Sequence, residues 1–483
     1  MVKTLSRSPT LSVIVGAGVS AEARLPVWRR LVEDLLDRAA EERLELTETA
    51  HRAAWKAQIL SGESPLGAAA VAEALAGDDL REWIPEALYG EAPERFQPGP
   101  IAQQLPVLRE AFGTGLTLLT TNYDDLVEAA FGAGDGPVAA VPYTGPGDDA
   151  PPTGERHQRV VHLHGFLARD GRRAGDVVLT EGDYQTVATQ DWQAAHVGHA
   201  LMETPCLFIG SSLTDPNLLR YLHRHRGEGA VRHFAIFTRQ DAYEPGTPAE
   251  VVRAREMALK ERWRSSNLEI VFVDHYAEIA QALAEVARAK REDDAYVPLP
   301  ERLAAWHQRV SDELLLPDGP EAFAEAQEYL HEALRIALDV ALSQARDLGH
   351  DHGDEVLAAA LFLLDESGST LTNWATTDRV HRDQATIEAI PIGERSSWAA
   401  VRAFCRGVAL GEPRDVYASR WKYIRALPFS TADGLPAGVI TVASLRAKET
   451  TMLDGMPDPV EAAFDDALRA VVRDILTLPF EST

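Results

Sequence analysis

The chain has 483 residues, of which 45% are hydrophobic and 25% are charged, a composition typical of soluble globular proteins. This length is too great for one ordinary core and predicts two or three domains. The formal net charge of -27 would repel a phosphate backbone, so we expect no direct nucleic-acid partner. No apolar run approaches the roughly 20 residues that cross a bilayer, and the N-terminus lacks the apolar stretch of a signal peptide. We therefore expect no membrane partner and a cytoplasmic location.

The cysteine content limits the kinds of site that the chain can form. Only Cys206 and Cys405 are present, one in each half of the chain. Two distant cysteines exclude a disulfide framework and a zinc module built from paired CxxC motifs. We expect both to be small buried side chains, and we expect no bound metal.

The first part of the chain alternates apolar strands with helical patterns. A strand is predicted at 11–15 and a helix at 20–40, and a helical insertion broken by glycine and proline follows at about 40–112. Further strands are predicted at 116–119, 138–141, 160–163, 176–179, 206–209, 233–237 and 268–273. Nearly continuous apolar strands are typical of a parallel sheet covered on both faces. The prediction is an α/β, Rossmann-like domain over residues 1–290.

The second part of the chain has a different pattern. A charged cluster at 288–294 is either a linker or the charged end of a helix, and we assign 291–350 to a linker and a helical segment. Strands at 356–364 and 370–376 flank a turn, and shorter strands and helices follow before a closing amphipathic helix at 459–476. This order is α+β, so a second domain is predicted over 351–483.

Four polar motifs follow predicted strands. They are Gly16-Ala17-Gly18-Val19-Ser20, Thr120-Thr121-Asn122-Tyr123-Asp124, His162-Leu163-His164-Gly165 and Gly210-Ser211-Ser212-Leu213-Thr214-Asp215-Pro216-Asn217. In an open α/β sheet the carboxyl ends of the strands meet at one crevice, so residues distant in sequence can form one site. We expect the functional site at this edge of the sheet.

Each motif also has a purely structural explanation. The glycines fit a tight turn with Ser20 as N-cap, Asn122 fits a helix cap, and a lone His164 fits a packing residue, with His162 as its nearest decoy. Asp215 before Pro216 is a complete helix-start signal that needs no function. The glycine pattern also occurs in nicotinamide dehydrogenases, but their fold requires a second strand and an acidic residue about 20 positions later. That alternative is disfavoured because no second strand is predicted there.

Taken together and in this order, the four motifs resemble the NAD-binding core of the sirtuins, over roughly residues 10–275. Two departures separate the chain from the protein deacylases of that family. Between Gly165 and Gly210 only Cys206 occurs, so the four-cysteine zinc module is missing, and Arg24-Leu25-Pro26-Val27-Trp28-Arg29 replaces a Gly-Ile-Pro-Asp-Phe-Arg stretch. The helical insertion and the Pro-x-Trp form resemble the sirtuin-like NAD hydrolases of bacterial anti-phage defence.

The resemblance implies NAD+ as substrate and cleavage of its nicotinamide–ribose bond. By the family match, Asn122 positions the ribose or the water, and His164 acts as general base. Asp124 supports the ribose or nicotinamide, and the first glycine loop holds the pyrophosphate. The NAD-binding residues implied are Gly16, Ala17, Gly18, Ser20, Pro26, Trp28, Thr121, Asp124, Gly210, Ser211 and Ser212.

Two other functions stay open at this stage: a non-catalytic sensor of NAD or ADP-ribose, and a protein deacylase without the zinc module. Residues 351–483 resemble GAF domains in pattern, without a ligand motif, which implies either a sensor or an oligomerisation domain. We expect a homo-oligomer that is held inactive until a small molecule or a protein acts on the C-terminal domain.

Overall fold

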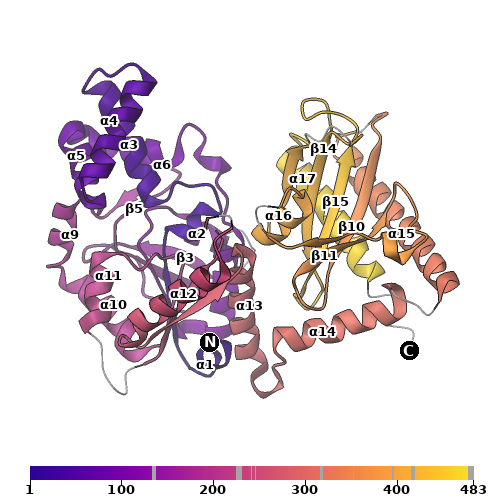
Figure 1. The fold of residues 1–483 in the computed structure, drawn as a ribbon. Helices are drawn as coiled ribbons and strands as arrows, with labels where there is room; N and C mark the ends of the chain where they lie inside the picture. The colour runs from indigo at the N-terminus through magenta and orange to yellow at the C-terminus, as the bar shows by residue number, and fades with distance from the viewer. Residues whose placement is uncertain are drawn as a thin grey trace. The chain divides into compact units, whose positions relative to one another are not determined.

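The computed structural model describes residues 1–132, 138–224, 231–240, 242–244, 246–315, 319–351, 353–393, 396–414 and 419–476. The chain forms two compact units, Met1–Asp274 with Glu278–Tyr296, and His275–Ala277 with Val297–Thr483 (Figure 1). None of the helices in these described ranges combines the length and the apolar character needed to span a membrane. The functional motifs all belong to the first unit.

A seven-stranded parallel sheet forms the centre of the first unit, in the order β3-β4-β2-β1-β7-β8-β9. Its strands are β1 (Leu11–Val15), β2 (Leu116–Thr120), β3 (Ala139–Tyr143), β4 (His157–His162), β7 (Cys206–Ile209), β8 (His233–Thr238) and β9 (Leu268–Val273). Every residue of β1 and β7 is buried, as expected of strands covered on both faces. The predicted Rossmann-like α/β fold is confirmed.

Helices follow most of these strands. They are α2 (Ala17–Ala21), α8 (Leu126–Gly132), α9 (Glu181–Val187), α10 (Asp191–Glu203), α11 (Pro216–Arg224), α12 (Ala249–Arg264) and α13 (Tyr276–Glu292), and a short helix, α1 (Val2–Ser6), precedes β1. The predicted single helix at 20–40 is wrong, because α2 ends at Ala21 and the next helix begins at Trp28. Pro26 disfavours helical backbone at the residue before it, which explains the interruption.

The predicted helical insertion is present between β1 and β2. Its helices are α3 (Trp28–Glu42), α4 (Thr49–Gly62), α5 (Pro65–Ala76), α6 (Leu80–Tyr89) and α7 (Pro100–Phe112). Residues of α3 to α6 such as Leu35, Ala69 and Trp83 form a core of their own with Tyr123 and Leu179, whereas α7 contacts α8 and β2. The insertion forms a helical layer at one end of the sheet (Figure 1).

One local prediction is corrected in the first unit, and one alternative is decided. Residues 176–179 are not a strand, and a short hairpin of β5 (Phe166–Leu167) and β6 (Arg173–Ala174) precedes them. Val178 is buried in a loop, where its backbone bonds His164 O and the Tyr123 hydroxyl in place of a strand partner. The charged cluster at 288–294 begins as the end of α13, where Lys290 donates to Ser8 O at 2.8 Å.

The second unit contains a six-stranded antiparallel sheet in the order β12-β11-β10-β15-β14-β13. Its elements are α14 (Leu299–Val310), α15 (Pro320–Asp347), β10 (Leu357–Leu364), β11 (Thr370–Thr376), β12 (Ala389–Pro391), α16 (Ala399–Arg406), β13 (Leu410–Pro413), β14 (Tyr423–Ser430), β15 (Pro436–Ser444) and α17 (Asp458–Ile475). The α+β class is confirmed, and β13 is an edge strand that the sequence pattern did not predict. Cys405 is buried here, and Cys206 is buried in the first unit.

A buried ion pair joins the sheet of the second unit to its last helix. Arg425 on β14 donates from Nε to Asp465 Oδ1 on α17 at 2.8 Å, and from its terminal nitrogens to Asp465 and Glu461. Arg425 and Asp465 are each 5% exposed. Charges this deeply buried are stabilising only while both partners are present.

Candidate active site

The four sequence motifs start from one row of paired residues. Val15 pairs with Thr120 on one side and with Ile209 on the other, and Thr120 pairs with His162. These residues end the neighbouring strands β4, β2, β1 and β7. The motifs therefore leave the sheet side by side at its carboxyl edge, as the sequence predicts for a fold of this type.

The two glycine loops are packed backbone against backbone. Gly16 N donates to Ile209 O and Gly18 N donates to Gly210 O, each at 2.9 Å. A Cβ atom on Gly16 would lie 2.6 Å from Gly210 O, and one on Gly210, whose φ is +62°, would lie 2.6 Å from Val19 N. These glycines are required for the close approach of the two loops, and the Gly18 amide is already bonded within the protein.

Asn122 lies at the centre of the hydrogen-bond network, two residues beyond the end of β2. Its backbone N–H donates to Thr120 Oγ1 at 2.9 Å, and its Nδ2 donates to Ser20 Oγ at 2.8 Å and to Gly16 O at 3.2 Å. The residue is 5% exposed, and its Oδ1 atom has no hydrogen-bond partner in the described part of the chain. A buried acceptor without a partner is costly, so it indicates a position for a donor from a ligand.

Ser20 and Asp124 connect the first loop to the second. Ser20 Oγ donates to Asp124 Oδ2 at 2.7 Å, and Leu126 N donates to Asp124 Oδ1 at 3.1 Å. Asp124 is 3% exposed, and burial raises its pKa against the effect of these hydrogen bonds. Both carboxyl oxygens are occupied within the protein, so Asp124 orients Ser20 and through it the amide of Asn122.

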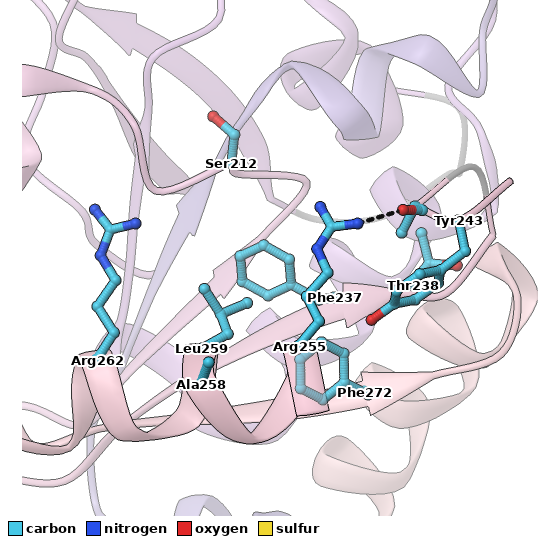
Figure 2. Close-up of a pocket in the computed structure, with 10 residues that line it drawn as sticks. Ser212, Phe237, Thr238, Tyr243, Arg255, Ala258, Leu259, Arg262 and Phe272 are labelled. Atoms are coloured by element: carbon cyan, nitrogen blue, oxygen red, sulfur yellow. Dashed lines mark hydrogen bonds between the residues drawn. The ribbon is translucent and has the colours of Figure 1, made fainter. Parts of the chain in front are cut away.

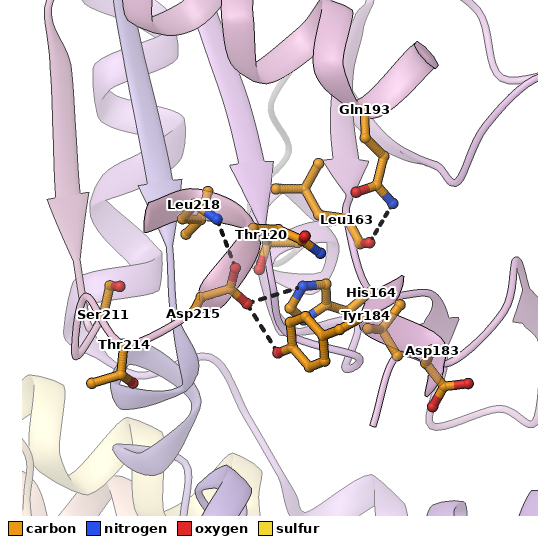
Figure 3. A network of polar contacts seen from close by, with 12 residues as sticks. Thr120, Leu163, His164, Asp183, Tyr184, Gln193, Ser211, Thr214, Asp215 and Leu218 are labelled. Atoms are coloured by element: carbon orange, nitrogen blue, oxygen red, sulfur yellow. Dashed lines mark hydrogen bonds and ion pairs between the residues drawn. The ribbon is translucent and has the colours of Figure 1, made fainter. Parts of the chain in front are cut away.

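His164 forms an ion pair with Asp215 across the site (Figure 3). His164 Nε2 lies 3.1 Å from Asp215 Oδ2, and the Tyr184 hydroxyl donates to the same oxygen at 3.0 Å. The other oxygen, Oδ1, accepts from Leu218 N at 2.8 Å and so caps α11. Burial would raise the pKa of Asp215, but the charge of His164 and these hydrogen bonds lower it below its usual range.

His162 occupies a separate, fully buried position behind Asn122. Its Nδ1 lies 3.1 Å from Asn122 O, and its Nε2 lies 2.8 Å from Glu128 Oε1 on α8. The ring of Phe166 contacts it edge-on, with ring centres 4.9 Å apart. His162 and His164 thus have different carboxylate partners although only one residue separates them.

The remaining predicted binding residues surround this centre less tightly. Thr121 N donates to Val15 O at 3.1 Å, and Ser211 Oγ accepts from Leu213 N at 3.2 Å. Ser212 is exposed, and its hydroxyl pairs with that of Thr214. Two further predicted residues, Pro26 and Trp28, lie in the link to α3 and at its first residue, and Trp28 packs against the insertion core.

A cavity of about 380 Å³ lies beside the fourth loop (Figure 2). It extends from Ser212 across Phe237 and Phe272, with α12 forming one wall. Arg255 and Arg262 project from that helix, and Arg255 donates to Ala242 O at 2.7 Å. The lining residues are Ser212, Phe237, Thr238, Ala242, Tyr243, Arg255, Ala258, Leu259, Arg262 and Phe272, and none of them is acidic.

Sequence reasoning missed three residues of this network. Asp215 was fully explained as a helix start, and its second contact depends on the pairing of strands far apart in sequence. Tyr184 and Glu128 lie on helices whose patterns contain no signal of a site. A usable signal existed only for Asp215, because it belongs to the fourth strand-end motif.

Part of the chain matches known proteins in sequence. Residues 116–270 match the sequence model of the SIR2-like domain. The NAD(+) hydrolase ThsA of Bacillus cereus (strain MSX-D12) is 28% identical over 178 residues, which cover 35% of this chain and 36% of that protein. The match thus spans about a third of the relative's length.

Solved structures also align with parts of the chain. A Sir2 homologue carrying a histidine-to-asparagine substitution, in complex with ADP-ribose, has 17% identity, covers 62% of this chain and 98% of its own, and gives a TM-score of 0.31. A GAF sensor protein from Burkholderia vietnamiensis has 15% identity, covers 37% of this chain and 90% of its own, and gives a TM-score of 0.19. By its sequence match, the chain contains a SIR2-like domain that includes residues 116–270.

Proposed function

We propose that the protein is an NAD+ hydrolase that cleaves the bond between nicotinamide and ribose. The SIR2-like match and the relative named as an NAD(+) hydrolase support this reaction class. The observation that carries the proposal is the unpartnered, buried Oδ1 of Asn122 at a sheet edge that also holds the His164–Asp215 pair. Glycosidic cleavage by water needs one polar group that holds the sugar and another that activates the water, and Asn122 and His164 can supply them.

The chemical step needs one acceptor of a proton. The carbon–nitrogen bond breaks with its electron pair leaving on nicotinamide, and positive charge develops on the ribose. Water attacks the C1′ carbon of the ribose, forms the new carbon–oxygen bond and loses a proton to His164. Asn122 Oδ1 accepts a hydrogen bond from a ribose hydroxyl or from the attacking water and so holds the two reactants together.

Asp215 sets the state of His164 for this role. A carboxylate can only accept, so Nε2 of His164 carries the proton in their contact. In the reacting state the ring is neutral, with its lone pair on Nδ1, and this atom takes the proton from water; the ion pair with Asp215 is the protonated state that follows. Asp215 stabilises the imidazolium that results, as a carboxylate does for the histidine of a hydrolase triad.

The adenosine end of NAD+ is assigned to the cavity beside Ser212. The rings of Phe237 and Phe272 provide apolar surface for the adenine, and Arg255 and Arg262 supply positive charge for the phosphates. The exposed Ser212 hydroxyl lies between this cavity and the glycine loops. A dinucleotide would thus extend from the cavity across the loops to Asn122.

The test is nicotinamide release by the purified full-length protein, beside Asn122→Ala and His164→Ala. Loss of release in both variants supports the hydrolase, and release at the parent rate in either one rejects these roles. The control is His157→Ala, an exposed histidine at the start of β4. Saturable NAD binding without release would leave two functions, a locked hydrolase that awaits its activator and the non-catalytic sensor. O-acyl-ADP-ribose formed from an acylated peptide would favour a deacylase.

We further propose that the second unit receives the activating signal of an anti-phage effector. It contains a cavity of about 230 Å³ on its sheet, with the aromatic residues Phe362, Trp398 and Trp421 in the wall. Asn373 also lines this cavity, and its buried Oδ1 has no partner in the described residues. A small planar molecule with a hydrogen-bond donor fits this chemistry as the trigger.

This regulatory role and a homo-oligomeric state are tested separately from the chemistry. A chain ending at Tyr296 should have NAD turnover that differs from that of the full-length protein, and identical turnover would contradict control by the second unit. Light scattering of the full-length protein measures the oligomeric state. In cells challenged with phage, Asn122→Ala should abolish both the fall in NAD and the protection.

A further inference from the structure

Every polar atom of Asn122 except one is bonded within the protein. The backbone N–H is bonded to Thr120, the side-chain Nδ2 to Ser20 and Gly16, and the carbonyl oxygen to His162. Only Oδ1 has no partner in the described residues. The residue is thus fixed from three elements of the fold, and His162 supplies the contact that fixes its backbone carbonyl.

The hydrogen bonds of His162 determine its charge. The carbonyl oxygen of Asn122 can only accept, so Nδ1 of His162 donates to it. The carboxylate of Glu128 also accepts, so Nε2 donates as well. A ring that donates from both nitrogens is an imidazolium, and Glu128 balances its charge.

The surroundings of His162 agree with this charge state. The side chain is 0% exposed, and the charged groups that act on it are Glu128 from α8 and Asp124 from the loop after β2. Burial alone would lower the pKa of His162, but the charge of Glu128 and the hydrogen bonds to Glu128 and Asn122 raise it above its usual value. Because both nitrogens are occupied and no ring atom reaches solvent, His162 cannot itself accept a proton from water.

We propose that His162 and Glu128 form a positioning pair for Asn122, holding its backbone so that Oδ1 points to the reacting ribose or water. This inference rests on the proposed hydrolase function. His162 acts through Asn122 and does not touch the substrate. The pair links the end of β4 to α8, so the position of Asn122 depends on a strand that is remote in sequence and on the helix that follows Asn122 in the chain.

A structural role alone would have different consequences. If the pair only filled the core, its loss would lower stability and reduce the amount of folded protein without changing the turnover of folded molecules. If it positions Asn122, kcat falls by much more than the affinity for NAD+ changes. A displacement of about 1 Å at a reacting group costs about 100-fold in rate.

The experiment compares full-length Glu128→Gln, His162→Asn and His162→Leu with the parent protein. Glutamine keeps the size of Glu128 and its acceptor oxygen but removes the charge. Asparagine retains an amide donor that can reach Asn122 O, whereas leucine retains none. The control is His157→Leu, on the same strand but exposed.

We expect kcat of His162→Leu to fall by about 100-fold or more, with KM within a few-fold of the parent. The kcat of His162→Asn should lie between that of His162→Leu and that of the parent. Glu128→Gln should lower kcat and shift the alkaline limb of the profile of kcat against pH to lower pH. A change of kcat that only follows the folded fraction, or no change at all, overturns the proposal. If His162→Leu does not fold, the kcat of Glu128→Gln and its dependence on pH test the proposal.

The two proposals fail in distinguishable ways. If neither the parent protein nor the chain ending at Tyr296 releases nicotinamide, the hydrolase function fails, and the positioning role is then measured by calorimetry with NAD+ as the probe. A loss of affinity in His162→Leu equal to that in Asn122→Ala supports the positioning pair. Unchanged affinity in His162→Leu, beside a loss in Asn122→Ala, overturns it.

Discussion

His164 Nε2 and Asp215 Oδ2 lie 3.1 Å apart, joining the loop after β4 to the start of α11. This contact gives one carboxylate two tasks, because the other oxygen of Asp215 caps the helix through Leu218 N. The two tasks can be separated by substitution, since asparagine caps helices as well as aspartate does but carries no charge.

Asp215→Asn should therefore lower NAD turnover by at least about 100-fold while leaving the melting temperature close to that of the parent. Asp215→Ala should lose the cap as well, at a further cost of about 1 kcal/mol in the free energy of unfolding. Steady-state kinetics and thermal unfolding of both variants provide the measurement. Parent-like turnover in Asp215→Asn would show that His164 works without its carboxylate partner.

A second prediction concerns pH and the carboxyl of Glu22, at the end of α2. Its Oε2 accepts from Ile101 N at the start of α7 at 3.0 Å, its Oε1 has no described partner, and burial raises its pKa to about 8. Because the folded protein holds this proton up to about pH 8 and the unfolded chain releases it near the ordinary carboxyl pKa of 4.5, the free energy of unfolding should fall as pH rises through this interval.

Glu22→Gln should remove this part of the pH dependence of stability. Its melting temperature should therefore rise relative to that of the parent as pH rises from 5 to 9. Melting temperatures of the two proteins across this range test the prediction. Glu110→Gln, at an exposed position on α7, serves as the control and should follow the parent curve. Parallel curves for Glu22→Gln and the parent would show that Glu22 titrates as it does in the unfolded chain.

The third prediction separates two costs at Gly210. Both Gly210 and Gly171 have a positive φ, of +62° and +86°. A Cβ atom on Gly210 would lie 2.6 Å from Val19 N, whereas one on Gly171 would meet open space. Gly171→Ala should cost about 1 kcal/mol or more for the backbone alone. Gly210→Ala should cost a further ~1–3 kcal/mol for the clash, as measured by urea unfolding. Equal losses would mean that the two loops separate easily.

A fourth prediction concerns the ion pair of the second unit. Asp465→Asn leaves Arg425 buried without its main counter-charge and should destabilise this unit by about 3–5 kcal/mol. The neighbouring Asp466→Asn, where the exposed carboxylate pairs with Arg469 at 3.3 Å, should cost no more than about 1 kcal/mol. Denaturant unfolding of both variants tests this prediction. Similar small losses in the free energy of unfolding would mean that water reaches the Arg425 site.

The sequence predicted the site where local pattern and sheet topology act together. Apolar strands that end in polar motifs were enough to place Asn122, His164 and the two glycine loops at one edge, because parallel strands have a common direction. Contacts across the sheet were not predictable, since the pairing of His164 with Asp215 and of His162 with Glu128 depends on which loops become neighbours. The segment at 176–179 was misread because a buried loop and a buried strand have the same apolar composition.

The row Ile209, Val15, Thr120 and His162 also determines when the site can exist during synthesis. Val15 and His162 are synthesised long before Ile209. The strand that contains Ile209, β7, nevertheless pairs directly with β1 at the centre of the sheet. A nascent chain that ends before α11 lacks Asp215 and leaves the β1 loop without its partner. A product that terminates before α11 is therefore expected to be inert at this site, however well its first residues have folded.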